Sequence, residues 1–169
     1  MKRIRIEKVT LNIGCGADQA KLEKAMMLLK NITGLNPIKT FSTKRIPGWN
    51  LRPGLPIGCK ITLRKELAKD ILARLLAAVD GKLKMTQFDE NGNIAFGILE
   101  YIDIPNAKYD HKIGIMGLQV CVTLERPGYR IKKRRIAAKK ISNKHVIKKH
   151  EAIDFMKQNF EIEIGGEEA

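Results

Sequence analysis

The chain has 169 residues, of which 44% are hydrophobic, so it is long enough to bury a core of its own. Its 32 Lys and Arg against 18 Asp and Glu give a net charge of +14, and no apolar run approaches the ~18 residues of a membrane-spanning helix. Its three cysteines are odd in number and far apart in apolar strand patterns, which predicts buried free thiols in a reducing cytoplasm.

The first predicted elements are a strand and a helix. Apolar residues alternate through residues 4–14, with a slip at Glu7–Lys8 that indicates a bulge. Asp18 is placed to cap the helix that follows, and Gly34 with Pro37 ends it. The inward face of this helix is predicted to carry Leu22, Met26, Leu29 and Ile32.

A basic loop separates the next two predicted strands. Residues 37–42 form a short strand, and residues 43–56 contain three prolines, two glycines and no periodic pattern. Residues 57–64 alternate cleanly, which places on the inward face Ile57, Cys59, Ile61 and Leu63.

A second helix and three strands follow. The helix spans about residues 65–79 and ends at Gly81, with an inward face of Leu67, Ile71, Leu75 and Val79. A hairpin is predicted next, with its turn at residues 89–92 between strands at 84–88 and 94–102. After a loop, residues 117–125 form a further strand.

A basic segment and a short helix end the chain. Residues 126–150 have no clear apolar face, and we expect an extended arm or loop that orders on its partner. The last helix carries Ala152, Ile153, Met156 and Phe160. Hairpin strands interrupted by two helices predict an α+β fold with a mainly antiparallel sheet and helices packed on one face. No repeat or linker divides the chain, so we predict one domain over residues 1–169.

Motifs typical of catalytic or cofactor sites are incomplete. Gly14 and Gly16 lie between a strand and a helix, but Gln19 occupies the third small-residue position of a dinucleotide-binding motif. The three histidines lack Cys or carboxylate clusters at metal-ligand spacing, and no nucleophile elbow is present. We therefore predict no enzyme activity, no catalytic residues, no cofactor and no metal site.

The acidic residues avoid two long segments completely. Residues 24–65 contain nine Lys or Arg and residues 126–150 contain eleven, and neither segment contains Asp or Glu. Such single-sign blocks form a focused positive field that attracts a polyanion. Nucleic acid is the first interpretation, and an anionic membrane surface or an acidic protein is the alternative.

Two predicted strands offer a polar, cationic sheet face. Burial of the apolar residues leaves outward Lys60, Thr62 and Arg64 on one strand and Lys8, Thr10 and Asn12 on the other. Side by side, these residues can grip phosphates and 2′-hydroxyls across an RNA minor groove. The alternative is an ordinary solvated face, which explains poorly why no carboxylate joins the cations.

The loop at residues 43–56 is a second candidate contact. A fourteen-residue irregular loop in a compact domain is commonly functional. It contains the only tryptophan, and a stacking aromatic among cations is typical of nucleic-acid contacts. The candidate contact residues of the loop are Lys44, Arg45, Trp49 and Arg52. In the alternative interpretation, Trp49 folds back onto the sheet as a small satellite core.

Several segments resemble, in order, the signatures of one protein family. They are LNIGCG, ITGLNPIKT, KRIPGWNLRPGLPIGCKITLR and FDENGNIAFGILEYIDIP. The family is the universal large-subunit ribosomal protein number five, which holds 5S rRNA in the central protuberance. The resemblance covers roughly residues 5–125. The RPGYRIKKRR segment and the short start before the first strand are similar to the archaeal form.

The resemblance implies contacts for particular residues. In the family, an Asn of the first strand and a Thr of the third strand touch 5S rRNA, and here these are Asn12 and Thr62. Leu35 stands where the family often has Gln, and the neighbouring Asn36 could supply the missing amide. The basic loop at residues 43–56 would reach the P-site tRNA.

Further partners are implied by the same resemblance. The segment at residues 104–115 is similar to the family's contact with a small-subunit head protein across an intersubunit bridge, here through Tyr109, Asp110 and His111. We expect the basic arm to bind large-subunit rRNA through Arg130, Lys132, Lys133, Arg134 and Arg135. Neighbouring ribosomal proteins of the central protuberance would also contact the chain.

The leading hypothesis is therefore a cytoplasmic, ribosome-bound structural protein that attaches 5S rRNA to the large-subunit rRNA. It would also contact P-site tRNA and the small subunit, with no membrane partner. A transient basic RNA chaperone or assembly factor is the alternative, and an enzyme acting on RNA comes third.

Overall fold

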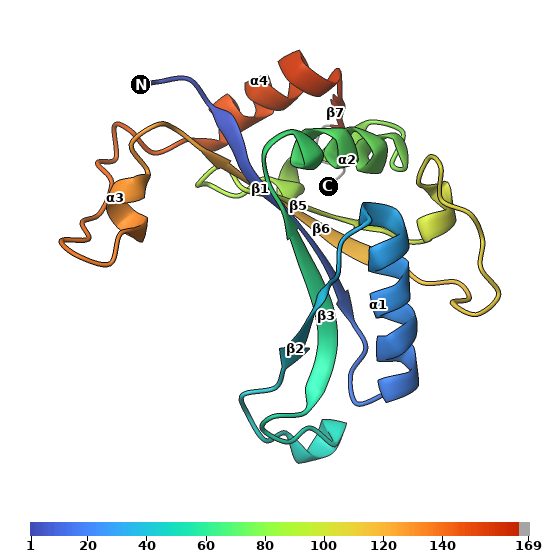
Figure 1. Cartoon of the computed structure of the whole chain (residues 1–169). Coiled ribbons are helices and arrows are strands. Elements are labelled where there is room, and N and C mark those ends of the chain that lie inside the picture. Colours follow the sequence, from blue (N-terminus) through green and yellow to red (C-terminus); the bar gives the residue numbers. More distant parts are fainter. Residues whose placement is uncertain (166–169) are drawn as a thin grey trace. The chain divides into compact units, whose positions relative to one another are not determined.

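A five-stranded sheet organises the protein, whose computed structural model describes residues 1–165 (Figure 1). The strand order is β2-β3-β1-β6-β5, and the strands are mostly antiparallel. The strands are β1 (Arg5–Gly14), β2 (Ile38–Phe41), β3 (Pro56–Leu63), β5 (Ile94–Ile98) and β6 (Leu118–Glu125). The predicted α+β fold is confirmed.

The chain divides into two compact units, which we describe separately. The α1 unit comprises Thr10–Leu63 and Gly97–Val120. The α2–α4 unit comprises Met1–Val9, Arg64–Phe96 and, within the described part of the chain, residues 121–165. Strands β1, β5 and β6 contribute residues to both units. The single domain over residues 1–169 stays a prediction, and residues 166–169 lie outside the described part of the chain.

In the α1 unit, helix α1 (Gln19–Thr33) packs against β3 (Figure 1). As predicted, Asp18 caps it: Oδ1 accepts hydrogen bonds from the backbone N–H groups of Ala20 at 2.9 Å and Lys21 at 3.1 Å. Gly34 ends the helix in the left-handed conformation, with φ of 73°. The buried face consists of Leu22, Ala25, Leu28, Leu29 and Ile32. The predicted inward position of Met26 was therefore partly wrong, because this residue is only half-buried.

Strands β2 and β3 form an antiparallel pair in the same unit. Ile38 lies opposite Lys60, and Thr40 lies opposite Gly58. The loop between the strands contains the short 3-10 helix η1 (Pro47–Trp49) at the far end of the pair (Figure 1). A second 3-10 helix, η3 (Tyr101–Asp103), follows β5.

The α2–α4 unit contains α2 (Lys65–Ala77), α3 (Arg130–Lys133) and α4 (Lys149–Phe160). The predicted inward face of the second helix was partly wrong, because Leu67 is 52% exposed and Val79 follows the end of α2. The buried residues are Ala68, Ile71, Leu72, Leu75 and Leu76. A 3.6-residue period fits either neighbouring stripe, and tertiary packing selects the one that is buried. In α4, Ala152 and Met156 are buried as predicted.

The predicted hairpin around residues 89–92 was also partly wrong. Its first strand is replaced by β4 (Lys82–Lys84) and the 3-10 helix η2 (Met85–Gln87). Only an isolated bridge joins Phe88 to Ile94. Strand β4 instead pairs in parallel with β7 (Glu163–Gly165). Alternation indicates which residues extend but not which strand they pair with.

Two of the three cysteines are buried, and Cys121 is exposed. Cys121 occupies an outward position of β6, between buried Val120 and Val122, so the prediction of three buried thiols was wrong for this residue. Burial, with a smaller contribution from Cys15, raises the pKa of the Cys59 thiol to about 11. The Cys59 thiol is therefore protonated and unreactive at neutral pH. No helix in residues 1–165 is long and apolar enough to cross a membrane.

Candidate nucleic-acid interface

Five side chains in the α1 unit form what we call the polar sheet face. They alternate along their strands with buried residues such as Leu11, Ile13 and Ile61. Because neighbouring residues of a strand point to opposite sides, the polar side chains lie away from the core. The polar sheet face consists of Thr10 and Asn12 of β1, Lys60 and Thr62 of β3, and Gln119 of β6, all exposed or half-buried.

Gln119 is the member of the polar sheet face that the sequence analysis did not identify as a site residue. Asn12 donates a hydrogen bond from Nδ2 to Oε1 of Gln119 at 3.2 Å. Strands β1 and β6 are neighbours in the sheet, which is why residues 107 positions apart can meet. The alternation in residues 117–125 predicted a strand, but only the strand order reveals the partner of Gln119. The pair leaves the Asn12 oxygen, the second N–H of Asn12 and both N–H groups of the Gln119 amide available for a ligand.

Gly58 sets the close approach of β3 to β1 beside this face. A Cβ atom on Gly58 would lie 2.6 Å from the backbone oxygen of Ile13 and 3.1 Å from Oγ1 of Thr40. The backbone N–H groups of Cys15 and Gly16 both donate to the oxygen of Ile57, at 2.9 and 3.0 Å. Gly58 therefore keeps the two strands that carry most of the face at hydrogen-bonding distance.

The strand segments of the α1 unit carry no carboxylate. The acidic residues of this unit lie on α1 and in loops: Asp18, Glu23, Glu100, Asp103 and Asp110. The Lys60 side chain is exposed to solvent, and no acidic residue belongs to the polar sheet face. The predicted residues Lys8 and Arg64 belong to the α2–α4 unit, where Lys8 is half-buried and Arg64 is exposed immediately before α2.

The loop at residues 43–56 presents its tryptophan to solvent. Trp49 is 70% exposed, which contradicts the satellite-core alternative. The residue that packs inward is Leu51, which is 8% exposed. Reciprocal backbone hydrogen bonds of 3.0 and 3.1 Å join Ile46 and Leu51 and close the loop tip. The three predicted cations of the loop are all exposed: Lys44, Arg45 and Arg52.

The other predicted contacts of the α1 unit are also at the surface. Asn36 is exposed after the end of α1, beside Leu35. Tyr109 is 51% exposed and meets the ring of His111 edge-on, with centroids 5.1 Å apart. The backbone N–H of Asp110 donates to the hydroxyl of buried Tyr101 at 3.0 Å, which fixes the start of this turn.

In the α2–α4 unit, the two ends of the basic segment at residues 126–150 are anchored. Arg126 is buried and contacts Oε1 of Glu151 at 2.6 Å. The hydroxyl of buried Tyr129 donates to the backbone oxygen of His145 at 3.2 Å and accepts from the N–H of Ile147 at 2.9 Å. Between these ends, residues 130–140 are exposed.

The cations of this segment differ in what they contact. Lys133 forms ion pairs with both Glu7 and Glu125. The ammonium of Lys132 lies 5.6 Å from the centroid of the Tyr129 ring. Nε of Arg134 donates to the backbone oxygen of Ala137 at 2.8 Å. Arg130 and Arg135 are exposed. Lys133 is therefore paired with carboxylates of the protein, whereas Arg134 bonds a backbone oxygen and Lys132 lies near an aromatic ring.

The pKa values around Lys133 reflect these ion pairs. Burial favours the neutral form of Glu125, but hydrogen bonds from Lys133 and Arg5 outweigh it and lower its pKa. Burial likewise opposes the charge of Lys133, and the hydrogen bonds to Glu7 and Glu125 outweigh it and raise the pKa of the amine. Glu125 and Lys133 are consequently both charged at neutral pH. No group of His, Cys, Asp or Glu in residues 1–165 is arranged to hold a metal ion.

Two family models together match most of the chain. The model described as Ribosomal protein L5 matches residues 1–52, and a second model, for the C-terminus of the same ribosomal family, matches residues 56–155. Among similar proteins, the large ribosomal subunit protein uL5 of Nanoarchaeum equitans is 50% identical, with 97% of each chain covered. The proteins of the same name from Sulfurisphaera tokodaii and Methanobrevibacter smithii are 44% and 45% identical. Those matches cover 97% and 96% of this chain, and 93% and 95% of the relatives.

Proposed function

The chain belongs to the ribosomal protein L5 family, and we propose that it holds 5S rRNA on its polar sheet face. As a member of this family it is a structural, rRNA-binding constituent of the large ribosomal subunit that serves in translation, and it is not an enzyme. The archaeal relatives identify it as an archaeal form. Ribosomes lie in the cytoplasm, and so does this chain as one of their components.

The polar sheet face carries the 5S rRNA proposal. Hydroxyls of Thr10 and Thr62 and the paired amides of Asn12 and Gln119 offer donors and acceptors side by side. Such groups suit the 2′-hydroxyls and base edges of an RNA minor groove, and the Lys60 ammonium suits a phosphate. The absence of carboxylates from the strand segments of this unit supports an anionic ligand. Lys8, Arg64 and Asn36 are proposed to extend the contact.

Two other surfaces of the α1 unit support the contacts beyond 5S rRNA. Exposed Trp49 among Lys44, Arg45 and Arg52 suits stacking and phosphate contacts, and we assign this loop to P-site tRNA. The turn at Tyr109, Asp110 and His111 is assigned to the small-subunit head protein across the intersubunit bridge. The exposed Tyr109 lies against the His111 ring, and tyrosine is enriched at protein interfaces.

The basic segment of the α2–α4 unit is assigned to large-subunit rRNA. Arg130, Lys132, Arg134 and Arg135 are exposed within a run that contains no carboxylate, which favours phosphate contacts. Lys133 supports this surface indirectly, because its ion pairs with Glu7 and Glu125 hold the segment in place. Neighbouring central-protuberance proteins complete the proposed partners.

Binding of 5S rRNA to single variants tests the main proposal. Asn12→Ala and Thr62→Ala should each weaken binding by about 1–3 kcal/mol, because each leaves a polar RNA group without its partner. Thermal unfolding of both variants should be nearly unchanged, since neither side chain belongs to the core.

Matched substitutions elsewhere serve as controls. Asn31→Ala on the exposed side of α1 and Thr86→Ala in η2 remove the same groups away from the polar sheet face, and both should bind 5S rRNA like the parent chain. A lower melting temperature with unaltered RNA affinity in the Asn12 and Thr62 variants would overturn the proposal.

A further inference from the structure

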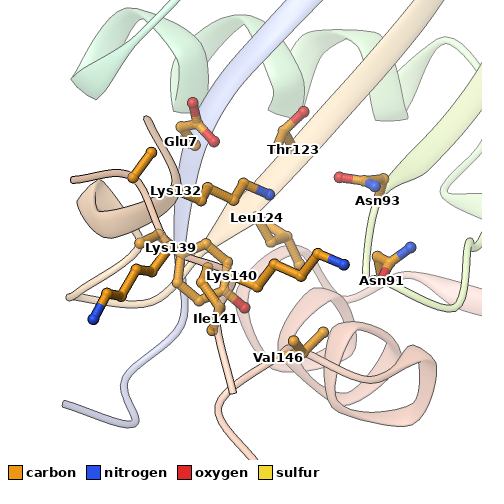
Figure 2. A pocket seen from close by; sticks show the side chains of 12 residues that line it. Glu7, Asn91, Asn93, Thr123, Leu124, Lys132, Lys139, Lys140, Ile141 and Val146 are labelled. Carbon is orange, nitrogen blue, oxygen red and sulfur yellow. The ribbon is translucent and has the colours of Figure 1, made fainter. Parts of the chain in front are cut away.

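A pocket of about 560 Å³ lies within the α2–α4 unit, and none of the residues assigned above to 5S rRNA lines it (Figure 2). It lies between the basic segment that follows β6 and the turn that precedes β5. Buried Leu124 and Tyr129 contribute apolar lining, and Thr123 contributes a hydroxyl. This volume is in the range of pockets that hold small ligands of nucleotide size.

The pocket is positively charged. Three of its twelve lining residues are lysines, and Glu7 is the single carboxylate among them. Lys133, outside the lining, already neutralises Glu7. Figure 2 shows the ammonium groups of Lys132 and Lys140 extending toward Asn93 and Asn91, whereas that of Lys139 points away from them. The charge inside the pocket therefore comes from Lys132 and Lys140.

Two amides on the opposite side of the pocket are held in one orientation. Nδ2 of Asn91 and Nδ2 of Asn93 both donate to Oδ2 of Asp89, at 3.4 and 3.1 Å. The hydrogen bond from Asn93 is the largest cause of the lowered pKa of Asp89, so this carboxylate is ionised at neutral pH. One N–H of each amide is thus engaged, and each amide oxygen remains available as an acceptor. The Asn93 oxygen lies on the side that faces Lys132 (Figure 2).

We propose that this pocket receives one unpaired nucleotide of RNA, with its phosphate on Lys132 and Lys140 and an exocyclic amino group of its base on the oxygens of Asn91 and Asn93. Proteins commonly recognise RNA by splaying out single bases and hydrogen-bonding their edges. An exocyclic amino group offers two N–H donors, one for each amide oxygen, so cytosine, adenine or guanine fits better than uracil, whose base has only the N3–H donor. This inference rests on the proposed function, because it presumes an RNA partner, but none of its residues belongs to the polar sheet face.

Nuclear magnetic resonance with the full chain tests the pocket, using cytidine 5′-monophosphate, uridine 5′-monophosphate and inorganic phosphate as probes. The cytidine nucleotide should shift the side-chain amide signals of Asn91 and Asn93. It should also bind about threefold to tenfold more tightly than the uridine nucleotide, as one additional hydrogen bond predicts. Asn93→Leu should erase that difference while leaving the phosphate-dependent shifts in place. If Asn93→Leu unfolds, Asn91→Leu is the replacement.

Lys139 provides the matched control for Lys140, since both are exposed in the same segment and their side chains diverge. Lys140→Met should weaken binding of the cytidine nucleotide at least threefold, and Lys139→Met should change it less than twofold. The pocket proposal would be overturned if both lysine variants lost the same affinity for the cytidine nucleotide, or if the two nucleotides bound equally well. It would also be overturned if the NMR signals shifted only on the polar sheet face. Those results would leave the 5S rRNA proposal standing, because it is tested by the Asn12 and Thr62 variants.

Discussion

Asn12 and Gln119 meet through their side-chain amides at 3.2 Å, across two neighbouring strands of the sheet. The hydrogen bond is exposed, so it exchanges with water at little net gain in folding free energy. Its effect is orientation: with one amide N–H occupied, the remaining oxygen and N–H groups of the pair point to fixed sides. An RNA base edge or ribose would then meet a paired donor and acceptor.

A double-mutant cycle should detect this orientation. Gln119→Ala should weaken 5S rRNA binding by about 1 kcal/mol. The double variant with Asn12→Ala should lose less than the sum of the two single losses, because residues in one hydrogen-bond network are not additive. Urea unfolding of the same proteins should show coupling below about 1 kcal/mol, as for other cross-strand pairs. Strict additivity in RNA affinity would mean that the two amides act independently.

The salt dependence of 5S rRNA binding should identify the phosphate contacts. Log affinity should fall linearly with log salt concentration, and Lys60→Met or Arg64→Met should each reduce the slope by about one unit. Lys69→Met is the control, because the Lys69 ammonium already lies 3.3 Å from Glu66 on α2. If the Lys60 and Arg64 variants keep the parent slope, these side chains are only solvated.

The fluorescence of Trp49 should show directly that its side chain is exposed. Because it is 70% exposed, its fluorescence in the isolated protein should be red-shifted and readily quenched by acrylamide. Trp49→Ala combined with Arg45→Ala should leave 5S rRNA binding intact and weaken retention of P-site tRNA on reconstituted ribosomes. Stacking alone contributes about 1–3 kcal/mol. A blue-shifted, unquenchable emission would contradict the exposed position.

Gly58→Ala should destabilise the protein. The added methyl group would lie 2.6 Å from the backbone oxygen of Ile13, so β1 and β3 must separate, at a cost of about 1–3 kcal/mol. Gly97→Ala on β5 is the matched control, because nothing lies within 4 Å of its added Cβ. Urea unfolding compares the two variants, and equal stabilities would mean that the strands tolerate a wider spacing.

Acid should weaken the α2–α4 unit through Glu125. The folded protein lowers the pKa of Glu125, so its contribution to stability is present above the unfolded value of 4.5 and is lost as the pH falls through the folded pKa. Lys133→Met removes the ammonium that lowers this pKa, and should move the loss of stability to higher pH. Urea unfolding at a series of acidic pH values measures it. An unchanged acid limb would show that Arg5 alone keeps Glu125 ionised.

Local patterns predicted much of the sheet but not its long-range pairs. Alternation along β1 and β3 was sufficient to place Asn12 and Thr62 on the polar side, because a strand has a fixed two-residue period. The partner of Asn12 depends on the strand order, which alternation does not encode. For the same reason the parallel pairing of β4 with β7 was missed.

The sequence also did not predict which cations of the basic segment form ion pairs within the protein. Lys133 looks like its neighbours in a run of cations, yet it alone pairs with carboxylates from both β1 and β6. Such pairing requires Glu7 and Glu125 to lie on adjacent strands and the chain to turn back after β6. Charge counting alone therefore does not show which of these cations already pair with carboxylates of the protein.

The loop at residues 43–56 separates the residues that maintain its shape from those that meet its partner. Buried Leu51 and its backbone hydrogen bonds to Ile46 close the tip, and neither involves the side chains of Trp49 or the cations. Substitutions at Trp49 or Arg45 therefore leave the framework intact. The chemistry of the tip can diverge among relatives, or be redesigned, while the scaffold that presents it stays the same.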